Sequence, residues 1–429
     1  MSEGGAYPAI GSFLRPAAFY GPNCGIIYAA IESMIERGQK VDLLTVSEAV
    51  KSEGITASYL VECTEATTTT AAIEYHAEIV HQKAKAREAL ALAVQLEKAA
   101  YADEHLDAAL VMGSERLADM QASGRVQFET SETVITAGLN STLHAYEMQR
   151  QHRGWIPGYR TGFPGLDRMI LGLTPGKHHI FAGRPGAGKS SLLLDLVDGL
   201  ERHGTPSLVI SLEDDSEGIA ARMLSRRSRV AGMSLRTGSY GAVQVGDIST
   251  AAQSMARYRA QWDFKSFKLS QVRRAIRQAA QKGVQVVFLD YLQLVEHDGQ
   301  KQKWGSYESA TDISKKLTQD AKASGIALVS MAQLSRAGDS RSDKRPIMSD
   351  LRDSGQIEQD AYVIGFIHRP IMYNDDAPPD DARLIIRKAR NGLCGELPLR
   401  FIGSETRFEE PNAPLEPIPE AQDEIAWTE

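Results

Sequence analysis

The sequence predicts an α/β fold with a twisted, mostly parallel sheet, preceded by a small all-α domain. Three observations lead to this prediction. From Thr161 onward, short β-branched segments alternate with helical ones, and most of the short segments are too apolar to have a face in water. A glycine-rich turn at residues 183–188 lies between one such strand and a helix. Residues 24–121 instead show helical periodicity with few strand signals.

The N-terminal part is expected to consist of helices joined by short connections. The segment "IIYAAIESMIERG" places Ile27, Ile31 and Met34 along one face and ends at a glycine. Two more helices are predicted in "AAIEYHAEIVHQKAKAREALALAVQLEKAA" and "HLDAALVMGSERLADMQ". We assign residues 1–121 to this domain.

A polar stretch at residues 122–157 is predicted to be a linker that contains one helix. "SETVITAGLNSTLHAYEMQRQHRG" has a Ser-x-Glu start, and Gly154 and Pro157 are expected to end it. The α/β domain follows, over residues 158–408, with late antiparallel additions. Its strand candidates are "KHHIFAG", "PSLVISLE", "VQVVFLDY", "IALVSMAQL", "AYVIGFIHR", "RLIIRKAR" and "LPLRFIG".

The charges are unevenly distributed along the chain. The formal net charge is −7, from 48 basic and 55 acidic residues. Residues 409–429 carry seven acids and no Lys or Arg, so the rest of the chain sums to zero and local basic patches can form. We expect this proline-containing acidic tail to be disordered.

Neither an anchor nor a signal peptide is expected. No apolar run approaches membrane-spanning length, and the N-terminus lacks a basic region followed by an apolar one. We therefore expect a cytoplasmic protein with no membrane partner. Cys24, Cys63 and Cys394 lack metal-ligand spacing and are expected to be reduced.

The stretch "FAGRPGAGKSSLLL" has the GxxxxGK[ST] pattern between a strand and a helix, which indicates a phosphate-binding loop. Its glycines let backbone N–H groups turn toward anionic oxygens, and the start of the helix adds positive potential. Lys189 would reach the β- and γ-phosphates of ATP, and the Ser190 hydroxyl would complete an Mg²⁺ shell. The expected nucleotide-binding residues are Gly183, Arg184, Pro185, Gly186, Ala187, Gly188, Lys189, Ser190 and Ser191.

Polar residues at the ends of later strands would supply the chemistry of hydrolysis. Glu213 directly follows "LVISL" and could deprotonate the attacking water, although a neighbouring acid or a helix-capping role is the alternative. Asp290 ends the buried strand "VQVVFLD" and could hold Mg²⁺ through water. Gln333 ends "IALVSMAQ" and could sense the γ-phosphate, or be an ordinary polar strand end.

Two basic segments follow the sensor candidate. Residues 335–352, "SRAGDSRSDKRPIMSDLR", form either a solvated loop or a loop that contacts nucleic-acid phosphates. "IIRKARNGLCG" places Arg387, Lys388 and Arg390 before an Asn-Gly turn, so a hairpin would carry them. They are either solvated or complete the site of a neighbouring subunit, as an arginine finger does.

Taken in order, "TGFPGLDRMILGLTPG", "AGRPGAGKSS", "ISLED", "DYLQL", "AQLSR", "DKRPIMSDLRDSGQIEQDA" and "RKARNG" resemble the RecA-like P-loop ATPase domain of DnaB-type replicative helicases. The resemblance covers residues 158–408. "GIIYAAIESMIERGQKVDLLTVSEAVKSEG" and "IEYHAEIVHQKAKARE" resemble that family's N-terminal collar domain, here with its opening helices shortened or absent. One departure is Asp214, where the family tends to have an apolar residue.

The resemblance implies a homohexameric ring that encircles single-stranded DNA, uses ATP and Mg²⁺ to move 5′ to 3′, and unwinds forked DNA, with primase and a helicase loader as further partners. It implies that Glu213 is the catalytic base, that Lys388 and Arg390 are the finger cations and that the linker helix docks on the next subunit. Arg352, Asp353 and Gly355 would hold the DNA backbone. Two alternatives remain open: a recombinase-type ATPase that coats or remodels DNA, and a nucleotide-switched, non-catalytic binding module.

Overall fold

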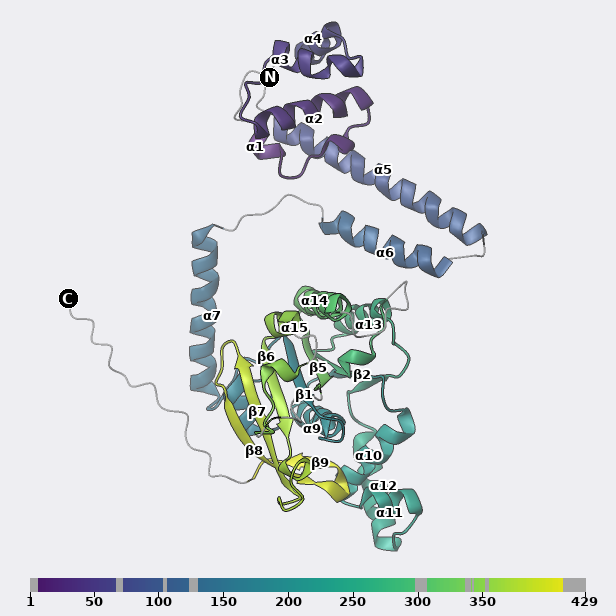
Figure 1. Ribbon diagram of the computed structural model, residues 1–429, viewed down its shortest axis with the longest axis vertical. Coiled ribbons are helices and arrows are strands. Elements are labelled where there is room, and N and C mark those ends of the chain that lie inside the picture. Colours follow the sequence, from purple (N-terminus) through teal and green to yellow (C-terminus); the bar gives the residue numbers. More distant parts are fainter. Residues whose placement is uncertain are drawn as a thin grey trace, which may run out of the picture. The chain divides into compact units, whose positions relative to one another are not determined.

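The computed structural model describes residues 7–66, 72–102, 106–122, 130–297, 307–335, 341, 343–351 and 355–411. The chain divides into two compact units, Met1–Gly138 and Leu139–Glu429 (Figure 1). The second unit holds the sheet and is called the sheet unit. Cys24, Cys63 and Cys394 are all free thiols, as expected.

The described part of the first unit contains helices and no strand, which confirms the predicted all-α domain. Two small apolar clusters hold it together. Val46 and Leu60, both fully buried, lie in one cluster, and Leu14 lies in the other. The helices are α1 (Tyr7–Ile10), α2 (Pro22–Glu36), α3 (Leu43–Val50), α4 (Ala57–Glu65), α5 (Ile73–Tyr101) and α6 (Leu106–Ala122).

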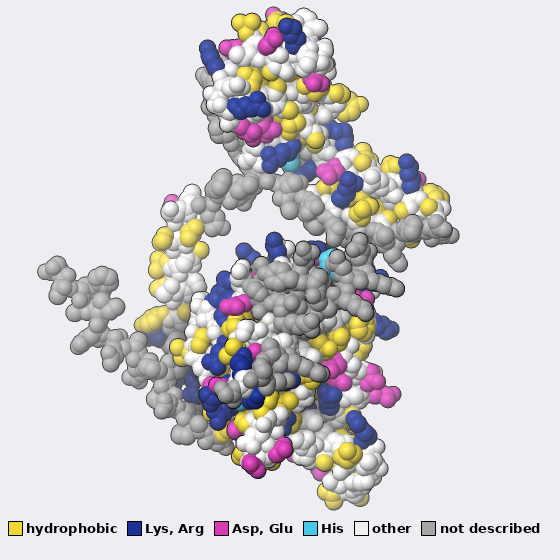
Figure 2. All heavy atoms as spheres, viewed as in Figure 1, with side chains coloured by type: hydrophobic (Ala, Val, Ile, Leu, Met, Phe, Trp, Pro, Cys, Tyr) yellow, Lys and Arg dark blue, Asp and Glu magenta, His cyan; other side chains and the backbone are white. Residues whose placement is uncertain are grey.

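Helix α7 (Ser131–Gln151) corresponds to the predicted linker helix. None of its side chains is buried. Its apolar residues are instead exposed, and Figure 2 shows hydrophobic side chains along the helix. Spacings of three and four residues place such side chains on one face of a helix, so among the described residues α7 presents an exposed apolar stripe. The exposed apolar residues are Val134, Ile135, Leu139, Leu143 and Tyr146.

The sheet unit is built on a nine-stranded sheet in the order β3-β2-β4-β5-β1-β6-β7-β8-β9 (Figure 1). Strands β3 to β6 in this order are parallel, and β7, β8 and β9 add antiparallel pairs at one edge. The strands are β1 (His178–Gly183), β2 (Ser207–Ser211), β3 (Gln261–Asp263), β4 (Val286–Asp290), β5 (Ala327–Gln333), β6 (Val363–His368), β7 (Asp381–Ala389), β8 (Gly395–Ile402) and β9 (Arg407–Glu409).

Helices cover both faces of this sheet. Successive strand residues point to opposite faces, so Phe181 packs with the residues of α9 while Ile180 and Ala182 pack with those of α13 and α14. Both faces are therefore shielded from water, which explains why the central strands are continuous apolar runs rather than alternating apolar and polar residues. The helices of the unit are α8 (Pro164–Ile170), α9 (Lys189–Arg202), α10 (Ser216–Ser228), α11 (Gly232–Thr237), α12 (Ala242–Met255), α13 (Leu269–Gln281), α14 (Tyr307–Ser324) and α15 (Gly355–Asp360).

All seven strand candidates are strands, which confirms the predicted fold class, but β3 and β9 were not predicted. Each has only three residues. Strand β9 also corrects the expected start of the acidic tail. Glu409 is in the sheet, and both carboxylate oxygens of Glu410 accept the N–H of Gly165 at 2.9 Å. Residues 412–429 lie outside the described residues.

Candidate functional site

The predicted phosphate-binding loop lies between β1 and α9. Gly186 (φ 77°) and Gly188 (φ 102°) adopt backbone angles that other residues rarely tolerate. A Cβ added at Gly188 would also approach the Phe408 ring to 2.9 Å. Gly188 is the N-cap of α9 and offers no side chain to the first N–H groups of the helix. Those N–H groups are thus available to an anion such as a phosphate.

Lys189 and Asp290 are buried close to each other beside this loop. Burial lowers the pKa of Lys189, while the charges of Glu213 and Asp290 raise it. The Nζ atom of Lys189 lies 5.7 Å from the centre of the Tyr291 ring, within cation–π range. The structure therefore brings together the lysine and both carboxylates that the sequence singled out.

Asp290 and Ser190 provide oxygen ligands of the kind that Mg²⁺ prefers. Burial raises the pKa of Asp290 to about 6, a hydrogen bond with the Ser190 side chain lowers it, and the charge of Glu213 raises it. Among the described residues, Asp290 Oδ1 has no hydrogen-bond partner. A buried oxygen without a partner is costly, and a cation at this position would remove that cost. The residues present therefore fit an Mg²⁺ ion.

Glu213 is the candidate base among the three consecutive acids that follow β2. It is exposed and follows β2, whose last residue Ser211 pairs with Asp290 of β4. The two neighbouring acids have structural partners. Asp214 forms an ion pair with Arg222 at 2.9 Å, and Asp215 caps α10 by accepting the N–H of Gly218 at 2.8 Å. These partners favour Glu213 over its neighbours as the catalytic base.

The Gln333 main chain is held on both sides at the end of β5. On one side, Gln333 pairs with Gly183, the first residue of the phosphate loop. On the other side, the Gln293 side chain bonds to both main-chain groups of Gln333. Gln293 was not identified from the sequence, where the only signal is an amide inside the apolar segment "YLQL". Tyr291, over which Lys189 lies, was missed in the same segment.

The basic segment after Gln333 is partly fixed by its own acid. The Arg341 guanidinium donates to both oxygens of Asp350, at 2.9 and 2.5 Å, and the Ser335 N–H donates to the Asp350 carbonyl at 2.8 Å. Arg341 is therefore engaged within its own loop. Of the predicted DNA-binding residues, Arg352 and Asp353 lie outside the described residues, and Gly355 is the first residue of α15.

The two finger candidates contact α15 in their own chain. Lys388 Nζ donates to the carbonyls of Glu358 and Gln359, and Arg390 Nη2 donates to the Gln359 carbonyl at 2.7 Å. Burial lowers the pKa of Lys388, and the charge of Arg390 lowers it further. Cations at the C-terminal end of a helix stabilise its last carbonyls. Within the described residues, the hydrogen bonds of both side chains therefore go to α15 rather than to their own phosphate loop.

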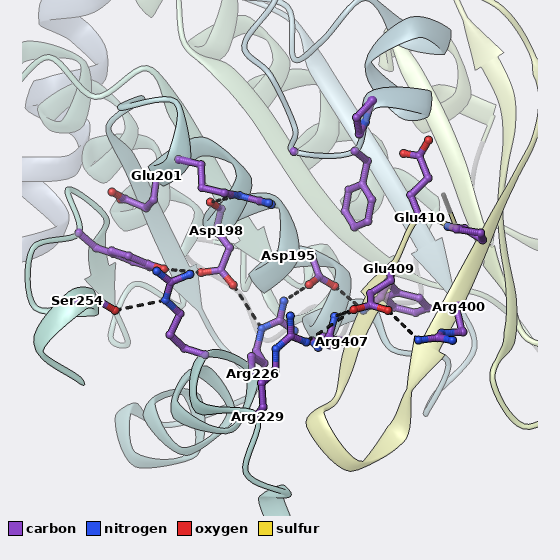
Figure 3. A pocket seen from close by; sticks show the side chains of 18 of the residues that line it. Asp195, Asp198, Glu201, Arg226, Arg229, Ser254, Arg400, Arg407, Glu409 and Glu410 are labelled. Atoms are coloured by element: carbon purple, nitrogen blue, oxygen red, sulfur yellow. Dashed lines mark hydrogen bonds and ion pairs between the residues drawn. The ribbon is translucent and has the colours of Figure 1, made fainter. Parts of the chain in front are cut away.

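A cavity of about 880 Å³ lies beside α9, between α10 and β9 (Figure 3). Arg226 is one of the buried residues that line it. It forms an ion pair with Asp195 of α9 and donates to the carbonyls of Ser191 and Thr406. Asp195 also accepts the N–H of Phe408 at 2.8 Å, and burial raises its pKa to about 7 although Arg226 lowers it. This network, which no sequence signal indicated, joins the first two turns of α9 to α10 and β9.

Two further features are absent from the described residues. No group of three or more His, Cys, Asp or Glu side chains in the described part of the chain is arranged to hold a metal ion. In the same part of the chain, no helix combines the length and the apolar character that crossing a membrane would need.

Comparison with known proteins identifies relatives over nearly the whole chain. The chain is 30% identical over 419 residues to the replicative DNA helicase DnaB of Geobacillus stearothermophilus, covering 94% of this chain and 91% of that protein. It is 30% identical to the replicative DNA helicase DnaC of Bacillus subtilis, covering 92% of this chain and 88% of that protein. The replicative DNA helicase DnaB of Leifsonia xyli is 31% identical, with the same coverage.

Solved structures with the same fold agree. A DnaB-like replicative helicase, whose interactions with primase were described, superposes with a TM-score of 0.74 at 24% identity and covers 94% of this chain and 98% of its own. A second solved structure, an ATPase domain, gives a TM-score of 0.59 at 27% identity, over 63% of this chain and 96% of that domain. The profile for the DnaB-like helicase C terminal domain matches residues 158–410, and the N terminal domain profile matches residues 1–82. The chain belongs to the DnaB-like helicase family.

Proposed function

We propose that the chain is the subunit of a replicative DNA helicase, a homohexameric ring that moves 5′ to 3′ on single-stranded DNA and unwinds duplex DNA at a fork. The observation that supports this most directly is that Lys189, Glu213 and Asp290 meet beside the phosphate loop of a DnaB-like motor. The replicative helicases to which the chain is similar cover it over more than nine-tenths of its length.

Each residue of the site has a role in ATP hydrolysis in this proposal. The N–H groups of residues 183–191 and the Lys189 ammonium bind the phosphates, and Glu213 takes the proton of the attacking water. Ser190 and Asp290 would hold Mg²⁺, which supplies positive charge to the β- and γ-phosphates. Gln333 senses the γ-phosphate. Lys388 and Arg390 stabilise the charge that develops in the site of the adjacent subunit.

Contacts with partners complete the proposal. Arg352, Asp353 and Gly355 would hold the DNA backbone, which gives no sequence preference. The exposed apolar stripe of α7 would dock on the adjacent subunit of the ring. Primase is proposed as a partner because a similar helicase was described with its primase interactions. A loader is proposed because a closed ring must open to admit DNA. We expect the ring to act at fork DNA in the cytoplasm.

The alternatives differ in what they do with ATP and with a fork. A recombinase-type ATPase would hydrolyse ATP on DNA without separating strands, and a nucleotide-switched binding module would not turn ATP over. Membership of the DnaB-like family favours a helicase over a recombinase-type ATPase. The presence of Glu213, Asp290 and Gln333 at the expected positions favours ATP turnover over a non-catalytic binding module.

Strand displacement is measured on two matched forks, one with a free 5′ single-stranded tail and one with only a 3′ tail, with ATP and Mg²⁺. The proposal expects displacement that requires the 5′ tail and is absent from Lys189→Ala. DNA-stimulated ATP turnover with no displacement from either fork, at protein concentrations at which the ring forms, would instead support the recombinase-type alternative. Displacement only from the 3′-tailed fork would contradict the polarity.

A further inference from the structure

A glutamine outside the predicted site forms hydrogen bonds with the end of β5, the strand whose last residue is the proposed sensor Gln333. Gln293 lies in the 3₁₀ turn Leu292–Leu294 that follows β4. Its Nε2 donates to the Gln333 carbonyl at 3.2 Å, and its Oε1 accepts the Gln333 N–H at 3.1 Å. We propose that Gln293 is a positioning residue for ATP hydrolysis, which fixes the main chain of Gln333 and thereby aims the Gln333 side chain at the nucleotide.

The need for Gln293 follows from the register of the sheet. The pairing of β4 with β5 ends at Leu289 and Ser330, so β5 continues for three residues beyond its β4 partner. The Gln333 N–H and carbonyl that face β4 would have no strand to bond. An unpaired polar group of the backbone is costly away from water. A primary amide has the same donor and acceptor as a peptide group, so the Gln293 side chain takes the place of the missing strand residue.

The position of Gln333 matters because it is connected to the phosphate loop. Gln333 pairs with Gly183 in the parallel register, and the N–H of Leu334 donates to the Gly183 carbonyl at 3.2 Å. One residue further on, Arg184 Nη1 donates to the Ser335 carbonyl at 2.9 Å. The end of β5 therefore cannot move without straining the first residues of the phosphate loop.

Gln293 also ties the sensor to the metal ligand. It follows Asp290 by three residues in a short turn, and the carbonyl of Asp290 is itself fixed by the N–H of Leu212 at 2.8 Å. The amide thus connects the strand that ends in the metal ligand to the strand that ends in the sensor. This inference rests on the proposed function, because the position of the Gln333 side chain affects the reaction only if the site hydrolyses ATP.

The first test replaces Gln293 in the full-length chain. Gln293→Met keeps the length of the side chain and removes both hydrogen bonds, and we expect DNA-stimulated kcat to fall about tenfold with less than a twofold change in the KM for ATP. The matched control is Gln285→Met, an exposed glutamine just before the other end of β4, which should keep wild-type turnover. An unchanged kcat in Gln293→Met would overturn the proposal.

The second test distinguishes positioning from a general loss of structure. In Gln293→Glu, an ionised carboxylate cannot donate to the Gln333 carbonyl, whereas a protonated carboxyl has one donor and one acceptor like the amide. With the ordinary pKa of a glutamate, about 4.3, roughly a sixth of this carboxyl is protonated at pH 5 and almost none at pH 8. The ratio of its kcat to that of the wild type should therefore rise about twofold between pH 8 and pH 5. In Gln293→Met the same ratio should stay flat. A flat ratio in both variants would contradict the paired hydrogen bonds as the cause.

The third test asks whether Gln293 acts through the sensor. If it does, Gln293→Met should lower kcat less than twofold in a chain that already carries Gln333→Ala. A full tenfold loss in that background would show that Gln293 does not act through the Gln333 side chain, which overturns the proposal. The proposed function fails separately, if Lys189→Ala turns ATP over at the wild-type rate or the wild type displaces no strand.

Discussion

Replacing Arg390 tests whether the ATP site is shared between subunits. Arg390 is exposed, and in its own chain its side chain donates to one carbonyl, that of Gln359. Losing one exposed hydrogen bond should cost about 1 kcal/mol of stability or less. An arginine finger is worth roughly a thousandfold or more in kcat, which is about 4 kcal/mol of barrier. Arg390→Ala should therefore fold and bind nucleotide normally while losing turnover.

Mixed rings provide the decisive assay. A competent site needs Lys189 from one chain and Arg390 from the next, so neither Lys189→Ala nor Arg390→Ala alone can form one. In a ring assembled at random from equal amounts of the two variants, about one site in four combines both intact residues. We therefore expect DNA-stimulated turnover of up to about a quarter of the wild-type value per subunit, although each variant alone is inactive.

Arg387 is exposed on β7, the strand that leads to Arg390, and Arg387→Ala should keep turnover close to the wild-type value. The chains must be mixed before the ring assembles, and the mixed assembly is verified by capture of one tagged variant with the other. If verified mixed rings show no turnover above that of the separate variants, Arg390 does not complete a neighbour's site.

Three further substitutions in the sheet unit have expected outcomes. Lys189→Ala should abolish ATP turnover, and normal turnover would refute the phosphate-loop assignment. The variant should remain folded, as followed by tryptophan fluorescence, because burial disfavours the Lys189 ammonium by more than Glu213 and Asp290 favour it. Burial lowers the pKa of His178 from its usual 6.5 to about 3. Between these two pH values, the unfolded chain binds a proton at His178 that the folded chain does not bind. The free energy of unfolding is therefore highest above pH 6.5 and falls as the pH is lowered, by about 2 kcal/mol at pH 5. His178→Gln should lose correspondingly less stability in urea between pH 7 and 5, and equal losses would contradict the cause. Arg226→Met should lower the free energy of unfolding by about 3–5 kcal/mol, because it leaves Asp195 buried without its cation. Asp195→Asn in the same chain should recover part of that loss. A loss under about 1 kcal/mol would show that the network does not stabilise the fold.

The fold could be predicted from the sequence because its signals are local. The central strands are continuous apolar runs, which marks them as buried on both faces, and the phosphate loop has a pattern that fixes its place between a strand and a helix. The order of the strands is not local: β1 lies between β5 and β6, which follow it by more than 140 residues. Strands β3 and β9 are too short to give a periodic signal.

The candidate site was predictable to the extent that its residues end strands. Glu213, Asp290 and Gln333 each follow an apolar run, and the carboxyl ends of parallel strands meet at one edge of a sheet. Gln293 and Arg226 do not follow this rule. Gln293 acts on a residue 40 positions away, and Arg226 acts on one 31 positions away, through contacts that only the packed structure defines. A single chain does not contain the expected target of Lys388 and Arg390, because that target belongs to another subunit.

The strand order gives a physical reason why one nucleotide could affect both the DNA and the next subunit. Gly183, where the phosphate loop begins, pairs with Gln333 of β5 on one side and with Ile367 of β6 on the other. Strand β5 leads into the segment held by Asp350, toward the proposed DNA-binding residues. Strand β6 pairs with β7, where Ile364 lies opposite Lys388. Because a packed sheet transmits strain rather than absorbing it, a displacement of Gly183 on ATP hydrolysis would be felt at both neighbouring strands. Lys388 and Arg390 hold the end of α15, whose first residue is Gly355, so a finger that left α15 for a neighbour's phosphate would also release the helix next to the proposed DNA contact.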